Sequence, residues 1–254
     1  MTVKEKLAAF IETLKNGDKW PDAPPEVLSP LNGIEVNPNL TLPTGTILYR
    51  ARIKDGDCLI RESPFEGFGK EESGAPPSCC AKAGRANPEG ISYLYCAFDK
   101  FVAISEIRPS LADIISVAEI KVVKELSILD LTKPFNIEYE EKAVLIDELN
   151  LLFSKPIRNN ESSTEYIATQ FIASYIKKLG YHGIAYKSAC LNNANIDNPI
   201  NVAIFYPNYC EAISSQLYKV SYIDIKSEPI GGGTEISSIG EKEMAKISKF
   251  LETF

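Results

Sequence analysis

The sequence predicts an α+β fold, and three features of its 254 residues carry this prediction. Short segments such as 46–53 and 92–98 are rich in β-branched and aromatic residues, as strands are. Other segments, such as 2–15, place apolar residues at the three- and four-residue spacing of an amphipathic helix. Strands and helices do not alternate regularly along the chain, which favours α+β over a doubly wound parallel sheet.

The composition excludes several classes of function. The chain has 27 Lys and Arg against 34 Asp and Glu, a net charge of −7 and a pI near 5.0. Nucleic acids and anionic membranes both bind basic surfaces, so neither is an expected partner. There is no uninterrupted apolar run of roughly 18 residues, as a membrane helix needs. The charged N-terminal segment predicts no signal peptide, and we expect a cytoplasmic protein.

The six cysteines do not predict a metal site. They form no CxxC pair, and the chain has a single histidine, His182. Structural zinc sites usually show paired ligands at short spacing. The two closest thiols are the neighbours Cys79 and Cys80. We therefore expect free and mostly buried thiols, and no metal.

The chain is expected to have three parts. Residues 1–44 comprise an N-terminal helix over 2–15, with Thr2 and Glu5 as a capping box, and a proline-rich extended connector over 20–43. Residues 45–228 form the body. Residues 229–254 comprise a Gly231–Gly233 hinge, better explained as a linker than as a phosphate loop, and an amphipathic C-terminal helix over 241–254.

Within the body, we expect strands and helices separated by one long Gly- and Pro-rich loop over 54–90. The expected strands are 46–53, 92–98, one or two within 116–131, 184–188, 201–207 and 216–225. The expected helices are 100–107, 139–153 and a helix that begins near a capping box of Ser162 and Glu165 and ends at Leu179, before Gly180.

Familiar catalytic motifs are missing, but one set of polar residues is informative. No P-loop, GxGxxG, GxSxG or HExxH pattern occurs, and His182 at a helix-to-strand turn is better explained as structural. An arginine fork suits phosphates, an aromatic ring can stack on a planar base, and a carboxylate can stabilise positive charge at a sugar carbon. Residues of these types and their polar neighbours are Arg50, Arg85, Tyr95, Glu106, Ser188 and Asn201.

Each of these residues also has a purely structural explanation. Arg50 could be a surface cation at a strand end, and Tyr95 could pack in the core. Glu106 could be a surface acid, although its helix is otherwise apolar. Ser188 and Asn201 could hydrogen-bond only the backbone. From residue types alone these alternatives stay open.

Three segments resemble the RES domain family. They are LYRAR, GRANPEGISYLYCAFDKFVAISEI and GYHGIAYKSACLNNANIDNPINVAIF, and the resemblance spans about Gly45 to Pro207. It implies an ADP-ribosyltransferase-like core of small packed β-sheets with peripheral helices. It also implies a toxin that destroys NAD, in several members by phosphorolysis, and that pairs with an antitoxin. Ala86 stands where compact members have Trp, and their terminal Asn-Pro-His-Pro-like element is absent, so the chain resembles a longer branch of the family.

The resemblance assigns roles residue by residue. The family's Arg, Tyr, Glu and Ser fall on Arg50, Tyr95, Glu106 and Ser188, its later Asn on Asn201, and the GR-x-N arginine on Arg85. The implied catalytic residues are Glu106, Arg50 and Tyr95. The implied substrate-binding residues are Arg85, Ser188 and Asn201.

The resemblance leaves the reaction's acceptor open. NAD is the implied substrate, no cofactor is required, and inorganic phosphate or water is the expected acceptor. The alternatives are a mono-ADP-ribosyltransferase that modifies a macromolecule and an inactive module that only binds NAD or ADP-ribose. The implied partner is an antitoxin or inhibitor protein, and self-association into a homo-oligomer stays open.

Overall fold

The computed structural model describes residues 1–17, 21, 25–32, 40–54, 64–133, 140–156, 163–189 and 199–223. The chain divides into two units, Met1–Ser221 and Tyr222–Phe254. The predicted Gly231–Gly233 hinge and the predicted helix over 241–254 lie outside the described residues. None of the described helices has the length and apolar character that crossing a membrane requires.

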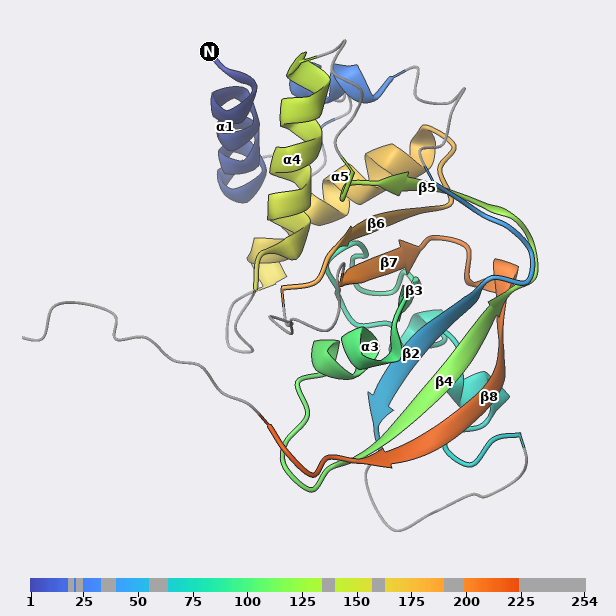
Figure 1. Cartoon of the computed structure of the whole chain (residues 1–254). Coiled ribbons are helices and arrows are strands. Elements are labelled where there is room, and N and C mark those ends of the chain that lie inside the picture. The colour runs from blue at the N-terminus through green and yellow to red at the C-terminus, as the bar shows by residue number, and fades with distance from the viewer. Residues whose placement is uncertain are drawn as a thin grey trace, which may run out of the picture. The chain divides into compact units, whose positions relative to one another are not determined.

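The first unit is built on one mixed sheet of eight strands, in the order β1-β5-β6-β7-β3-β2-β4-β8 (Figure 1). Neighbouring strands are antiparallel except β5 and β6, which are parallel. The strands are β1 (Leu40–Leu42), β2 (Ile47–Ile53), β3 (Leu94–Ala97), β4 (Ile114–Val122), β5 (Leu126–Asp130), β6 (Gly183–Lys187), β7 (Ile200–Ile204) and β8 (Cys210–Lys219). The predicted α+β class is confirmed.

The sheet consists of two halves that meet at β3 and β2. Between these strands only Tyr49 and Ala97 are paired, whereas β2 pairs with β4 along its whole length. One half is β1-β5-β6-β7-β3 and the other is β2-β4-β8 (Figure 1). The expected small sheets are therefore two parts of one sheet, and the strands diverge where the halves join.

Helix α1 (Val3–Asn16) begins and ends where the sequence predicts. The Thr2 hydroxyl accepts from the Glu5 amide at 3.2 Å, and the Glu5 carboxylate accepts from the Thr2 amide at 2.9 Å, which completes the capping box. Leu7, Phe10 and Leu14 are buried in the largest of the three apolar clusters that the described residues form. The helix therefore packs on its own chain.

The prediction of an extended connector over residues 20–43 was wrong for the parts that the structure describes as a helix and a strand. Pro25 leads into a 3-10 helix, Glu26–Leu31, and the segment ends in β1, which pairs with β5. Val27, Leu28 and Leu31 are buried. Burial of each such side chain contributes about 1.5–3 kcal/mol, and the fixed φ of proline is compatible with a tight helical turn. The apolar residues between the prolines therefore decide the structure.

Two further helices cover strands β5, β6 and β7 of the sheet (Figure 1). They are α4 (Glu140–Ser154) and α5 (Ile167–Lys178), and α5 is buried over most of its length. Gly180 follows α5 with φ +92°, a conformation that glycine adopts without strain. The predicted capping residue Ser162 lies outside the described residues.

The last strand of the sheet begins six residues earlier than predicted. The sequence predicts a strand over 216–225, but β8 runs from Cys210 to Lys219. The early part of β8 contains Glu211, Ser214 and Ser215, residues with low strand preference. Pairing with β4 from Val122 to Ile114 outweighs that preference, since it satisfies the backbone groups along the edge.

Helix α3 (Lys100–Glu106) lies where the two halves of the sheet meet (Figure 1). The Asp99 carboxylate caps it by accepting from the amides of Phe101 at 2.7 Å and Val102 at 3.3 Å. Val102 and Ala103 are buried against the sheet, whereas Phe101 is 53% exposed. The helix ends at Glu106, so this carboxylate lies at the junction of the halves.

Candidate active site

A cavity of about 610 Å³ lies beside the junction of the two half-sheets. This volume is within the range of small-molecule binding sites. The cavity is lined by three arginines, four tyrosines and one carboxylate, together with small and apolar residues. The charged and polar residues of the lining are Arg50, Arg85, Arg108, Tyr49, Tyr95, Tyr166, Tyr186, Glu106 and Asn201.

The Glu106 carboxylate is held by two side-chain donors. Ser188 Oγ donates to Glu106 Oε1 at 2.5 Å, and Asn201 Nδ2 donates to the same oxygen at 2.7 Å. Ser188 and Asn201 are only 9% and 4% exposed, whereas Glu106 is half-buried. Hydrogen bonds to an ionised acceptor are stronger than neutral ones. Among the described residues, both bonds fall on Oε1, so Oε2 is the oxygen left for a ligand.

The register of β7 explains why these groups converge. Asn201 pairs with Ala97 of β3 on one side and with Tyr186 of β6 on the other, so the three share one face of the sheet. Ser188 comes directly after the end of β6. The two donors therefore reach Glu106 from adjacent strands, while α3 supplies the carboxylate.

Tyr95 is fixed through its hydroxyl. The phenol donates to Asn87 Oδ1 at 2.6 Å and accepts from the Ala86 amide at 2.9 Å. The Asn87 amide in turn donates to the carbonyls of Lys82, Pro88 and Ile91. Burial raises the pKa of Tyr95 far above its ordinary value. The hydroxyl is thus hydrogen-bonded to the loop residues Ala86 and Asn87. The ring is the part of Tyr95 that a ligand would contact.

Arg50 combines a structural contact with a place in the cavity wall. Its Nη1 donates to the Ser73 carbonyl at 3.0 Å and also to the Gly74 carbonyl, at the end of the short helix α2 (Lys70–Ser73). Burial lowers the pKa of Arg50. A guanidinium carries five N–H donors, so its contacts to two carbonyls do not exhaust it. Arg50 can therefore hold the end of α2 and also bind a ligand in the cavity.

Two further arginines lie close to Glu106 in the lining. Arg85 Nη1 donates to the Lys155 carbonyl at 2.7 Å. Arg108 has φ +47°, a left-handed conformation that costs a non-glycine residue about 1–2 kcal/mol. Both arginines and Glu106 also line a small recess that adjoins α4. Strain of this kind is concentrated at functional sites.

The structure brings all six predicted site residues together. Five of them line the cavity, and Ser188 contacts Glu106 directly. The prediction missed Arg108 and three of the tyrosines. Tyr186 carried a usable signal, because it lies two residues before Ser188 on a strand and therefore on the same face. Arg108, Tyr49 and Tyr166 carried none.

Two other sequence predictions can be checked outside the cavity. His182 Nδ1 accepts from the Ser127 amide at 2.9 Å, and its ring packs on Tyr206 and Tyr209, so its structural role is confirmed. The prediction of mostly buried thiols was wrong for Cys79 and Cys80, which are both exposed. They lie on a short 3-10 turn of the long loop, Ser78–Cys80, which has no buried residue.

Comparisons with known proteins identify the family. The model of the RES domain matches residues 47–222, so this chain belongs to the RES domain family. No curated protein matches the chain. A chain of the M. tuberculosis MbcT-MbcA toxin-antitoxin complex is structurally similar, with a TM-score of 0.39 and 14% sequence identity over 75% of this chain and 93% of the other.

Proposed function

We propose that this RES domain protein cleaves NAD at the bond between nicotinamide and its ribose. The observation that carries the proposal is the Glu106 carboxylate, fixed by Ser188 and Asn201 at the wall of a cavity that arginines and tyrosines line. NAD offers a ribose beside a cationic leaving group, a planar ring and a pyrophosphate. The cavity contains a complementary group for each of these parts.

For this cleavage the protein needs only to orient NAD and to place a negative charge near the ribose. The C1′–N bond breaks with its electron pair passing to the nicotinamide nitrogen, so the leaving group becomes neutral and needs no general acid. Positive charge then develops on the ribose ring, as it does in glycoside cleavage. The free oxygen of Glu106 accepts a ribose hydroxyl and stabilises that charge, and preorganised groups of this kind contribute most when the charge develops.

The other residues of the cavity bind and orient. Arg50 and Arg85 are proposed to hold the pyrophosphate, because their backbone contacts keep each guanidinium in place and leave further N–H groups. The Tyr95 ring is proposed to stack on nicotinamide. Ser188 and Asn201 act through Glu106 and are positioning residues.

The acceptor completes the reaction at C1′. An oxygen of inorganic phosphate forms the new C–O bond and yields ADP-ribose-1″-phosphate, or water adds, loses a proton and yields ADP-ribose. We favour phosphate, because Arg108, which is not assigned to the pyrophosphate, also lines the cavity near Glu106, and a guanidinium binds oxyanions.

The test is to incubate the purified chain with NAD, with and without inorganic phosphate, and to identify the products by mass. ADP-ribose-1″-phosphate with release of nicotinamide is the expected result. ADP-ribose alone at saturating phosphate would make the protein a glycohydrolase. Transfer of ADP-ribose to an added protein would make it a transferase, and unchanged NAD would leave an inactive binding module.

We further propose that the protein is a growth toxin held in check by a partner. An enzyme that empties the NAD pool requires an inhibitor in the cell that makes it, and the family implies an antitoxin. Controlled expression should arrest growth and deplete NAD, whereas equal expression of Glu106→Gln should do neither. Arrest by the variant would show that toxicity does not depend on NAD cleavage.

A further inference from the structure

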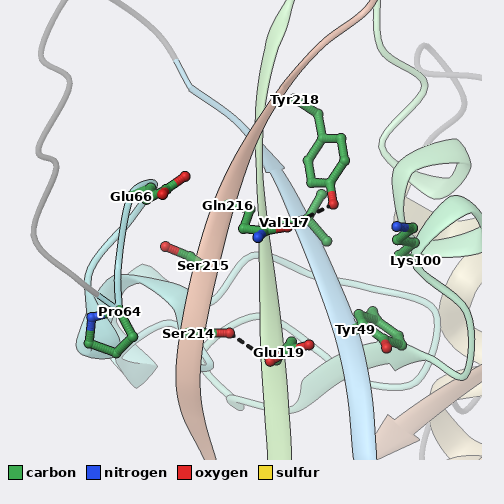
Figure 2. A pocket seen from close by; sticks show the side chains of 10 residues that line it. All are labelled: Tyr49, Pro64, Glu66, Lys100, Val117, Glu119, Ser214, Ser215, Gln216 and Tyr218. Carbon is green, nitrogen blue, oxygen red and sulfur yellow. Dashed lines mark hydrogen bonds between the residues drawn. The ribbon is translucent and has the colours of Figure 1, made fainter.

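A second cavity lies on the β2-β4-β8 half of the sheet (Figure 2). Its volume is about 350 Å³, and the start of α3 and a loop around residues 64–66 contribute to its walls. Tyr49 lines both this cavity and the candidate active site, and none of the other lining residues is shared. The second cavity is therefore separate from the candidate active site, and Tyr49 lies between them.

The strand registers place its polar groups in one row. Tyr49 pairs with Glu119 of β4, and Glu119 pairs with Ser214 of β8. Ser214 Oγ donates to Glu119 Oε2 at 2.7 Å, which fixes the half-buried carboxylate (Figure 2). An ionised carboxylate accepts about four hydrogen bonds. Glu119 thus keeps capacity for a ligand that brings two neighbouring hydroxyls, as the diol of a ribose does.

Further along β8, an amide and an aromatic ring follow two residues apart, Gln216 opposite Val117 and Tyr218 opposite Ile115. Tyr218 Oη donates to Gln216 Oε1 at 3.0 Å, so the carboxamide is oriented and its N–H groups remain donors. A glutamine amide matches the donor and acceptor edge of adenine. The rings of Tyr49 and Tyr218 lie on the same side of the cavity as Lys100 (Figure 2) and offer faces for a planar base.

Among the described residues of the lining, the one cation lies on α3. Lys100 is the first residue of the helix, and its Nζ lies 5.7 Å from the centre of the Tyr218 ring. An ammonium group binds a phosphate as a point charge. The lining also contains the carboxylates Glu66 and Glu119, so a bare oxyanion would meet more negative than positive charge. A ligand with a single phosphate attached to a neutral, hydroxyl-rich body fits better.

We infer that this second cavity binds an adenine ribonucleotide of the size of AMP. The base contacts Tyr218 and Gln216, the ribose diol donates to Glu119, and the phosphate faces Lys100. The inference rests on this cavity alone, so it holds whether or not NAD is the substrate of the other.

The test is calorimetric titration of the purified chain with AMP, adenosine and 2′-deoxy-AMP. The wild type should bind AMP more tightly than either analogue. Glu119→Gln keeps an oxygen for Ser214 but loses the charge, so it should bind AMP at least tenfold more weakly and no longer distinguish AMP from 2′-deoxy-AMP. Lys100→Met should bind AMP and adenosine alike.

Two control variants make the result decisive. Glu125→Gln changes an exposed carboxylate on the turn after β4 and should bind AMP like the wild type. Glu106→Gln removes the carboxylate of the other cavity and should also leave AMP binding unchanged. The inference is overturned if AMP does not bind at millimolar concentration, if neither Glu119→Gln nor Lys100→Met has its expected effect, or if Glu106→Gln abolishes binding.

Discussion

Replacing Glu106 by Gln separates the charge of this side chain from its shape. The amide has the same size, and its oxygen still accepts from Ser188 and Asn201 in the place of Oε1. Its –NH₂ group replaces Oε2, so the atom that faces the ligand becomes a donor without negative charge. The fold should therefore survive while the developing charge on the ribose loses its stabilisation.

The contacts set the expected magnitudes. The two bonds to Glu106 become neutral. Hydrogen bonds to charged groups contribute about 1.5–3 kcal/mol and neutral ones about 0.5–1.5 kcal/mol, so the free energy of unfolding should fall by about 2–3 kcal/mol. Loss of one transition-state contact of this type costs about 10²–10³ in kcat. KM should change less, because the full charge exists only in the transition state.

The assay is the rate of nicotinamide release at several NAD concentrations, together with a thermal unfolding curve for each variant. Glu125→Gln, at an exposed position away from both cavities, controls for the loss of one charge. Ser188→Ala removes one donor but keeps the carboxylate, so it should cost kcat only about tenfold. A folded Glu106→Gln variant that turns over NAD within a few-fold of the wild type would refute a catalytic role for Glu106.

Three further predictions concern the walls of the cavity and the single histidine. Gly84→Ala should lower Tm by several degrees and raise KM for NAD, because its Cβ would lie 2.6 Å from Asn87 Oδ1 and 2.8 Å from Tyr95 Oη. An unchanged Tm would show that the Tyr95 hydroxyl is not held in place by Asn87. Arg108→Gly removes a guanidinium from the cavity wall and relieves the strained φ, so it should raise KM for NAD several-fold; an unchanged KM would contradict a role of Arg108 in binding. Partial burial of His182 lowers its pKa below 6.5, and nearby Lys124 adds to this effect. The unfolded chain therefore takes up a proton first, and stability is lost as the pH falls below about 6.5. His182→Asn keeps an acceptor but does not titrate, so denaturant midpoints at pH 7.5 and 5 should differ less than in the wild type.

Local patterns were sufficient to predict most elements of the fold. The capping box at Thr2, the strand composition of 46–53 and the short helix after Asp99 all depend on neighbours within a few residues. The proline-rich segment was misinterpreted because burial of Val27 and Leu28 in the core is a tertiary effect. The early start of β8 likewise depends on its pairing with β4.

Some residues of the candidate site could likewise be predicted from the sequence, and others could not. Glu106 and Arg50 stood out through residue type and family resemblance, and the structure places both at one cavity. Arg108 and Tyr166 enter that cavity through the packing of elements that no local pattern connects. The conformation of Arg108 in particular, with φ +47°, is a property of the helix end and not of the residue type.

The site also requires the whole sheet. Ser188 and Asn201 reach Glu106 across 82 and 95 residues of sequence, and both depend on the pairing of β6 with β7. A slip of one residue would turn Asn201 to the opposite face. Gly183 opposes such a slip, because a Cβ there would lie 2.5 Å from the Ala203 carbonyl oxygen and the two strands approach too closely for another residue. The hydrogen bonds that hold the Glu106 carboxylate therefore depend on the register of β6 and β7.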